Sequence, residues 1–103
     1  MRTFQLPKRV KVGGIRYDVI LDPDRYWREG EHGRIAYVRH EIAIQPECDR
    51  LKTLTHELVH AIGEAIQHPP DEDATERIAH AVLAFMSDNP ALVRRAVDYL
   101  EAQ

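Results

Sequence analysis

The stretch TLTHELVHAIGE, residues 53–64, decides how the second half of this chain folds. Its apolar residues recur every three or four positions, which is the period of an amphipathic helix. We therefore expect one helix over residues from about 50 to 67, ending before Pro69 and Pro70 because proline cannot continue a helix. The apolar face of this helix extends to both sides of the stretch and consists of Leu51, Leu54, Leu58, Ala61, Ile62 and Ala65.

Two histidines in this helix, His56 and His60, lie four positions apart. Four residues turn an α-helix by about 400°, so both rings point to the same side, one turn apart, and can bind one zinc ion. Glu57 lies about 100° around the axis from His56, beside such a metal rather than on it. There it can take a proton from a water whose pKa zinc has lowered and pass it to a leaving amine. The pattern His-Glu-x-x-His therefore predicts hydrolysis of peptide bonds.

A solvated polar stripe on the helix is the competing interpretation of these residues. With six histidines in 103 residues, the pattern arises by chance in roughly 3% of chains of this composition. Two histidines beside a core-facing stripe also need polar partners when they are partly buried. Both points favour a metal site.

The third protein ligand of a catalytic zinc site has to come from elsewhere. Gly63 completes His-Glu-x-x-His-x-x-Gly, but the third histidine of the metzincin signature would fall at Ile66. The next helix offers Glu72, Glu76 and His80, which lie along one face. We expect Glu76 to be the ligand, with His80 as a rival or an outer partner. Glu72 is disfavoured because an antiparallel helix should place its ligand farther beyond the turn.

The first half of the chain has the two-residue period of β-strands. Residues 10–12 and 15–21 predict a hairpin around a Gly-Gly turn, and residues 33–38 and 42–45 predict a second one. The charged segment 25–32 between the hairpins is expected to be a loop.

Two further helices are expected after Pro70, one to about residue 87 and one over residues 91–101. The predicted fold class is α+β, with a small antiparallel sheet of about four strands followed by three helices. The length of 103 residues predicts a single domain over residues 1–103.

Composition and charge argue against several classes of function. A net charge of −3 argues against a nucleic-acid binder, and the longest apolar run, residues 81–86, is far short of a membrane span. A single cysteine, Cys48, excludes an internal disulfide, and residues 1–8 lack the apolar run of a signal peptide. We therefore expect a cytoplasmic protein that binds neither nucleic acid nor membranes.

The arrangement resembles the zincin metallopeptidases, specifically the gluzincin type, in which two histidines and a glutamate from a following helix hold zinc. Two strand pairs, the motif His56-Glu57-x-x-His60 and a helix containing Glu76 are similar to very compact members: the minigluzincins and the ImmA/IrrE-like or phage-encoded zincin-like proteins. The resemblance implies a zinc metallopeptidase with His56, His60 and Glu76 as ligands and Glu57 as general base.

In that group, the strand before the active-site helix usually borders the cleft and pairs with an extended protein or peptide substrate. Residues 42–45 would have that role here. Many members carry an Asp four residues after the ligand glutamate, which orients a zinc histidine, whereas here that position is His80. Either the outer partner differs, or Glu72 is the ligand and Glu76 the orienting residue.

Other residues are weaker candidates for a role in the site. Cys48 could bind zinc and keep an enzyme latent, although a small buried residue is the better interpretation. Two other functions stay open: a zinc-stabilised regulatory or interaction module without turnover, and a latent enzyme whose C-terminal residues cover the cleft. Residues that could stabilise an oxyanion, each with a rim or surface role as the favoured alternative, are His32, Arg34, Tyr37, His40 and Tyr99.

Overall fold

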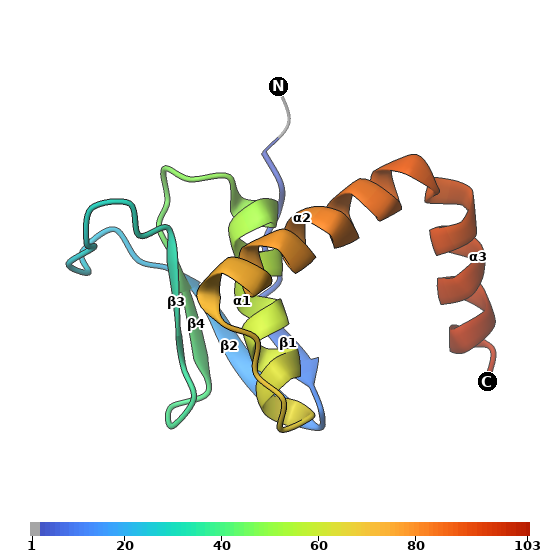
Figure 1. Ribbon diagram of the computed structural model, residues 1–103, viewed down its shortest axis with the longest axis horizontal. Helices are drawn as coiled ribbons and strands as arrows, with labels where there is room; N and C mark the ends of the chain where they lie inside the picture. Colours follow the sequence, from blue (N-terminus) through green and yellow to red (C-terminus); the bar gives the residue numbers. More distant parts are fainter. Residues whose placement is uncertain (1–2) are drawn as a thin grey trace.

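A four-stranded sheet and three helices form the chain, and the structure, a computed structural model, describes residues 3–103 (Figure 1). The predicted α+β class is confirmed, and each predicted element is present within a few residues of its expected bounds. In chain order the elements are β1 (Arg9–Val12), β2 (Ile15–Leu21), β3 (Gly33–Ala36), β4 (Glu41–Ile44), α1 (Arg50–Ala65), α2 (Glu72–Asp88) and α3 (Pro90–Glu101).

The sheet has the order β1-β2-β4-β3 and is mixed. Both predicted hairpins exist, and the first turns at Gly13 and Gly14, whose φ angles of 58° and 82° are in the region that glycine adopts without strain. The two hairpins join through β2 and β4, which run parallel with Val19 opposite Ile42. The prediction of a purely antiparallel sheet is therefore wrong.

The parallel join follows from where apolar side chains can be buried. Ile42, Ala43 and Ile44 of β4 are all 1% exposed or less, so both faces of this strand are covered. A strand apolar on both faces is most stable inside a sheet, where neighbours flank it on both edges. β4 therefore takes the inner position and leaves β3, the other strand of its hairpin, at the edge.

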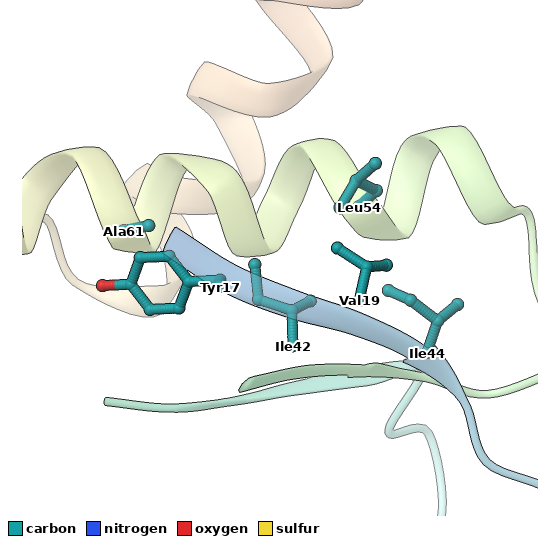
Figure 2. Close-up of a cluster of buried hydrophobic side chains, with 6 residues drawn as sticks. All are labelled: Tyr17, Val19, Ile42, Ile44, Leu54 and Ala61. Atoms are coloured by element: carbon teal, nitrogen blue, oxygen red, sulfur yellow. The ribbon is translucent and has the colours of Figure 1, made fainter. Parts of the chain in front are cut away.

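The core lies between one face of the sheet and α1 (Figure 2). Alternate residues of β2 and β4 point to this face, and α1 contributes residues seven positions apart, which a helix places on one side. The buried cluster consists of Tyr17, Val19, Ile42, Ile44, Leu54 and Ala61.

Helix α2 crosses α1, and α3 leads away from the sheet (Figure 1). Side-chain caps define where α1 and α2 begin: Asp49 accepts a hydrogen bond from the Lys52 amide, and Asp71 accepts one from the Ala74 amide. Within residues 3–103, no helix combines the length and apolar character needed to cross a membrane.

Replacing Ile42 with alanine tests whether β4 is the centre of the core. The side chain is fully buried, so Ile42→Ala should lower the free energy of unfolding by about 2–5 kcal/mol, measured by urea denaturation. Ile66→Ala is the matched control, because Ile66 is 65% exposed and its truncation should change stability by less than about 0.5 kcal/mol. Equal losses in the two variants would contradict this core.

Candidate metal centre

The motif on α1 presents His56 and His60 side by side, with ring centroids 5.0 Å apart. Their Nε2 atoms both lie against the carboxylate of Glu72, in the first turn of α2, at distances of 2.5 Å and 3.1 Å. One potential ligand atom from each of the three residues lies within 4.8 Å of the others. Two imidazoles and a carboxylate therefore converge on one point between α1 and α2.

This donor set fits a zinc ion. Catalytic zinc takes nitrogen and carboxylate ligands at about 2.0–2.2 Å, which places tetrahedral donors roughly 3.3 Å apart. The distances from Glu72 to the two histidines are slightly shorter than that, so shifts of less than about 1 Å would admit the ion. Three protein ligands leave the fourth position open.

Glu76, the residue expected to be the third ligand, lies on the other side of His56. Its Oε2 atom is 2.9 Å from Nδ1 of His56, and its Oε1 atom is 2.9 Å from Nε2 of His80. Although burial raises the pKa of Glu76, the charges and hydrogen bonds of His56 and His80 lower it below its usual value. A carboxylate on the far nitrogen fixes the tautomer and orientation of a metal-binding histidine. The geometry thus favours the arrangement in which Glu72 ligates and Glu76 orients.

Glu72 reaches the site because the chain folds back sharply after α1. The His68 amide donates a hydrogen bond to the Gly63 carbonyl, only three residues beyond His60. A Cβ atom on Gly63 would lie 2.7 Å from Cδ of Pro70, so the absence of a side chain permits this close contact. Helix α2 therefore begins level with the histidines, and Glu72 reaches them although it lies in the first turn of its helix, contrary to the expectation from turn length.

Glu57 lies beside the ligands and is almost completely buried, with 6% of its surface exposed. Burial raises the pKa of Glu57 to about 7; the charge of His56 opposes this rise, and the charges of Glu72 and Glu31 add to it. Gly33 leaves room for this carboxylate, because a Cβ atom there would lie 3.2 Å from Oε2 of Glu57. A carboxyl group that is easily protonated and deprotonated near neutrality suits proton transfer.

A cleft of about 1060 Å³ opens over the cluster. Three of the residues considered as oxyanion donors, His32, Arg34 and Tyr37, line it. The Tyr37 hydroxyl donates a hydrogen bond to the His60 carbonyl at 3.4 Å. Burial, reinforced by nearby negative charges, raises the pKa of Tyr37, so the hydroxyl keeps its proton at neutral pH and can donate it in a hydrogen bond.

The other candidates lie outside this cleft or have other contacts. His40 is in the turn between β3 and β4, with its ring centroid 5.8 Å from that of Tyr17. Tyr99 is on α3, and within residues 3–103 no residue of α3 lines the cleft or covers it. Cys48 lines the cleft but lies outside the ligand group, with Sγ 2.9 Å from the Gln45 carbonyl oxygen.

The strand expected to pair with substrate is not available for pairing. Residues 42–44 belong to β4, which is bonded to β2 on one side and β3 on the other. The free edge beside the cleft is that of β3, whose residues 33–35 line the cleft wall. Residues 42–44 therefore offer no free edge to an extended segment, contrary to the expectation for residues 42–45, whereas β3 does.

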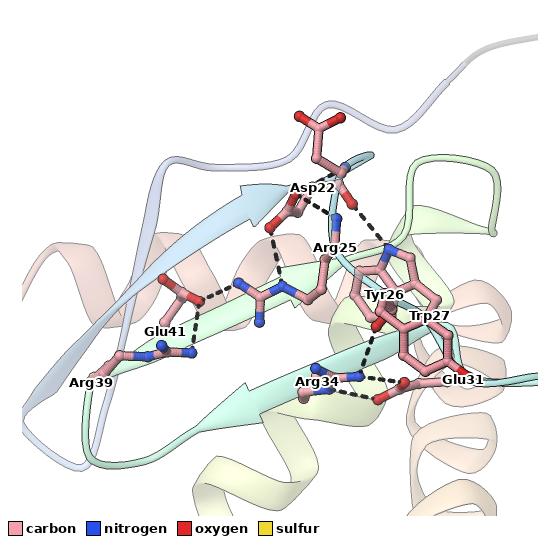
Figure 3. Close-up of polar contacts among 9 residues, drawn as sticks. Asp22, Arg25, Tyr26, Trp27, Glu31, Arg34, Arg39 and Glu41 are labelled. Atoms are coloured by element: carbon pink, nitrogen blue, oxygen red, sulfur yellow. Dashed lines mark hydrogen bonds and ion pairs between the residues drawn. The ribbon is translucent and has the colours of Figure 1, made fainter.

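The loop over residues 22–32 continues this wall and is held by a polar network that sequence reasoning missed (Figure 3). Arg25 joins Asp22 to Glu41 at 3.0 Å and 2.8 Å, which ties the loop to β4. Arg34 makes two hydrogen bonds to Glu31, at 2.8 Å and 2.7 Å, and its guanidinium lies 5.5 Å from the centroid of the Trp27 ring. The sequence does contain a signal for this network, because arginines and acidic residues are interspersed along the loop.

Comparisons with known proteins leave the site to be interpreted from its geometry. No protein-family model matches the chain, and no curated protein or solved structure matches it significantly.

The pair Glu31–Arg34 predicts a pH-dependent stability. Hydrogen bonding by Arg34, against the opposing effect of burial, lowers the pKa of Glu31 from 4.5 to about 2. A lowered pKa stabilises the fold above pH 4.5, and this contribution is lost as the pH falls towards 2. Arg34→Gln should therefore reduce the free energy of unfolding at neutral pH, and reduce it much less near about pH 2.5.

Urea denaturation of wild type and of Arg34→Gln, at neutral pH and near about pH 2.5, measures this difference in stability. Arg9→Gln is the matched control, because Arg9 pairs with Asp18 at a site where both side chains are more than half exposed. It should change stability little at either pH. A loss in Arg34→Gln that is the same at both pH values would contradict the role given to Glu31.

The geometry also predicts which glutamate binds metal. Glu72→Gln should abolish tight zinc binding, because it removes a ligand oxygen charge, whereas Glu76→Gln should weaken it about 10–100-fold by releasing His56. Chelator competition on the purified variants measures both effects, with His80→Ala as the control that should change affinity least. Loss of zinc in Glu76→Gln alone would restore Glu76 as the ligand.

Proposed function

We propose that this protein is a zinc-dependent metallopeptidase of the compact gluzincin type, with His56, His60 and Glu72 as the zinc ligands. The observation that carries the proposal is the convergence of these three side chains within 4.8 Å. Glu76, on the far nitrogen of His56, supports it, because metal-binding histidines are usually held by a carboxylate in that way. The buried Glu57 at the edge of the cluster adds a general base.

The chemistry follows from the groups around the cleft. Zinc, when bound, would polarise the scissile carbonyl and lower the pKa of water. Glu57 would accept the proton of the attacking water and deliver it to the departing amide nitrogen. The Tyr37 hydroxyl, which remains protonated at neutral pH, would turn from the His60 carbonyl and donate its hydrogen bond to the oxygen that gains negative charge.

An extended segment of a protein is the substrate that this cleft suits best. β3 has a free edge along the cleft, and an extended peptide can add to such an edge through backbone hydrogen bonds. Side chains of the bound peptide would then alternate between the cleft and solvent.

A cytoplasmic location completes this proposal. Cys48 is a free thiol, hydrogen-bonded to a backbone carbonyl, and such thiols persist in reducing compartments.

A zinc-stabilised module without turnover is the second candidate. The ligands come from two helices, and α2 buries only Thr75 and Ala79. A metal would therefore fasten α2 to α1, which is a structural gain independent of catalysis.

Glu57→Gln separates the two functions. In a peptidase, it should leave the fold and zinc content intact and reduce the rate of peptide cleavage about 10²–10⁴-fold, because only proton transfer is lost. Cleavage is measured by mass spectrometry on a mixture of unfolded proteins incubated with the zinc-loaded chain. Glu64→Gln is the matched control, since Glu64 is an exposed residue of the same helix that does not line the cleft.

The second candidate gives a different set of results. Wild type would cleave nothing, and chelation would lower its melting temperature as much as that of Glu57→Gln. Cleavage that Glu57→Gln retains in full would contradict the peptidase proposal.

A further inference from the structure

The second half of α2 together with α3, residues 81–101, forms an arm that extends beyond the sheet and α1 (Figure 1). α2 buries Thr75 and Ala79 where it crosses α1, and residues further along its length are not buried. α3 has no buried residue at all. We call residues 81–101 the C-terminal arm.

The stripe by which α2 rests on α1 continues along the arm, where much of it is exposed. Val82 and Met86 follow Thr75 and Ala79 at helical spacing, yet they are 41% and 43% exposed. Monomeric proteins rarely leave apolar surface of more than a few hundred Å² exposed in one patch. Large exposed apolar residues on α2 and α3 are Ile78, Val82, Phe85, Met86, Leu92, Val97, Tyr99 and Leu100.

The exposed area matches what a dimer needs. A large side chain has roughly 200 Å² of surface, so the seven of these residues that belong to the arm leave on the order of 750 Å² uncovered. A standard protein–protein interface buries about 800 Å² on each partner. Each chain contributes two helices with apolar stripes, α3 and the distal half of α2, to such an interface.

The charges on α3 fit a second copy of the same helix in the opposite direction. Arg94 and Glu101 are seven residues apart, so they lie on the same flank of the apolar stripe. When two such helices pack antiparallel about a two-fold axis, each flank meets its own counterpart, and Arg94 of each copy faces Glu101 of the other. Among residues 3–103, neither side chain forms an ion pair within the chain.

The same charges are unfavourable for an isolated helix. α3 has no acidic residue in its first turn and no basic residue in its last turn, where they would favour the helix dipole. Glu101 instead lies at the negative end, and Arg94 in the half nearer the positive end. An antiparallel partner offsets the unfavourable position of each charge, because it brings an opposite charge and the opposite end of a helix dipole to each end of α3.

We propose that the C-terminal arm is a homodimer interface, in which α3 pairs antiparallel with α3 of a second copy and the distal halves of α2 border the contact. A membrane surface is the less suitable occupant. α3 carries two arginines, one aspartate and one glutamate, so it lacks the excess of positive charge typical of helices that bind anionic lipid. This proposal is independent of the metal centre, because no residue of the arm lines the cleft.

Sedimentation equilibrium of the full chain tests the proposal. Wild type should have twice the mass of one 11.9 kDa chain. Leu100→Glu, at a position 67% exposed on the single chain, should be monomeric yet keep its helix content and zinc affinity. Val38→Glu is the matched control: Val38 is 96% exposed outside the arm, so this variant should remain dimeric.

Charge reversal tests the direction of the helices. Arg94→Glu alone and Glu101→Arg alone each place like charges opposite one another, and each should raise the dissociation constant about threefold to tenfold. Mixing the two variants should restore a heterodimer of wild-type affinity, since every contact is again attractive.

Three results would overturn the proposal: a monomeric wild type, a dimer that survives Leu100→Glu, or charge variants that fail to complement each other. A monomeric wild type that binds vesicles of anionic lipid would assign the arm to a membrane instead.

Discussion

Packing of one face of α1 against β2 and β4 is the constraint on which the rest of the molecule depends. Leu54 and Ala61 enter the core, so the rotation of the helix about its axis has only one solution (Figure 2). That rotation turns His56 and His60 towards α2 and leaves Glu57 buried at the border between core and cleft. The same hydrophobic contacts that stabilise the fold therefore orient the candidate ligands.

A second constraint is the contact between Gly63 and the two prolines after α1. It sets where α2 starts, and hence which glutamate meets the histidines. A larger side chain at position 63 would push the turn that contains Pro69 and Pro70 away from α1, and the start of α2 would shift along the axis of α1. The conformation of a six-residue connection, rather than the length of either helix, determines which residues form the candidate metal-ligating group.

Structural relationships between residues close together in the chain were predicted well, and those between residues far apart were not. Helix α1, both hairpins and the grouping of His56 with His60 follow from periodicity within short windows. The partner of those histidines depends on a turn whose path is decided by van der Waals contact at Gly63, which periodicity does not encode. The parallel pairing of β2 with β4 likewise depends on burial of β4 on both faces, a property of the assembled sheet.

The edge strand β3 has only four residues. Alternate residues of a strand turn their backbone groups outward, so an added peptide could gain only a few main-chain hydrogen bonds, each contributing about 0.5–1.5 kcal/mol. An edge this short also gives little template for sheet-to-sheet aggregation. In the proposed peptidase, a peptide held there would dissociate readily after cleavage, and selectivity among sequences would have to come from side chains in the cleft. If the proposed activity holds, the shortness of this strand would thus favour rapid product release over tight retention.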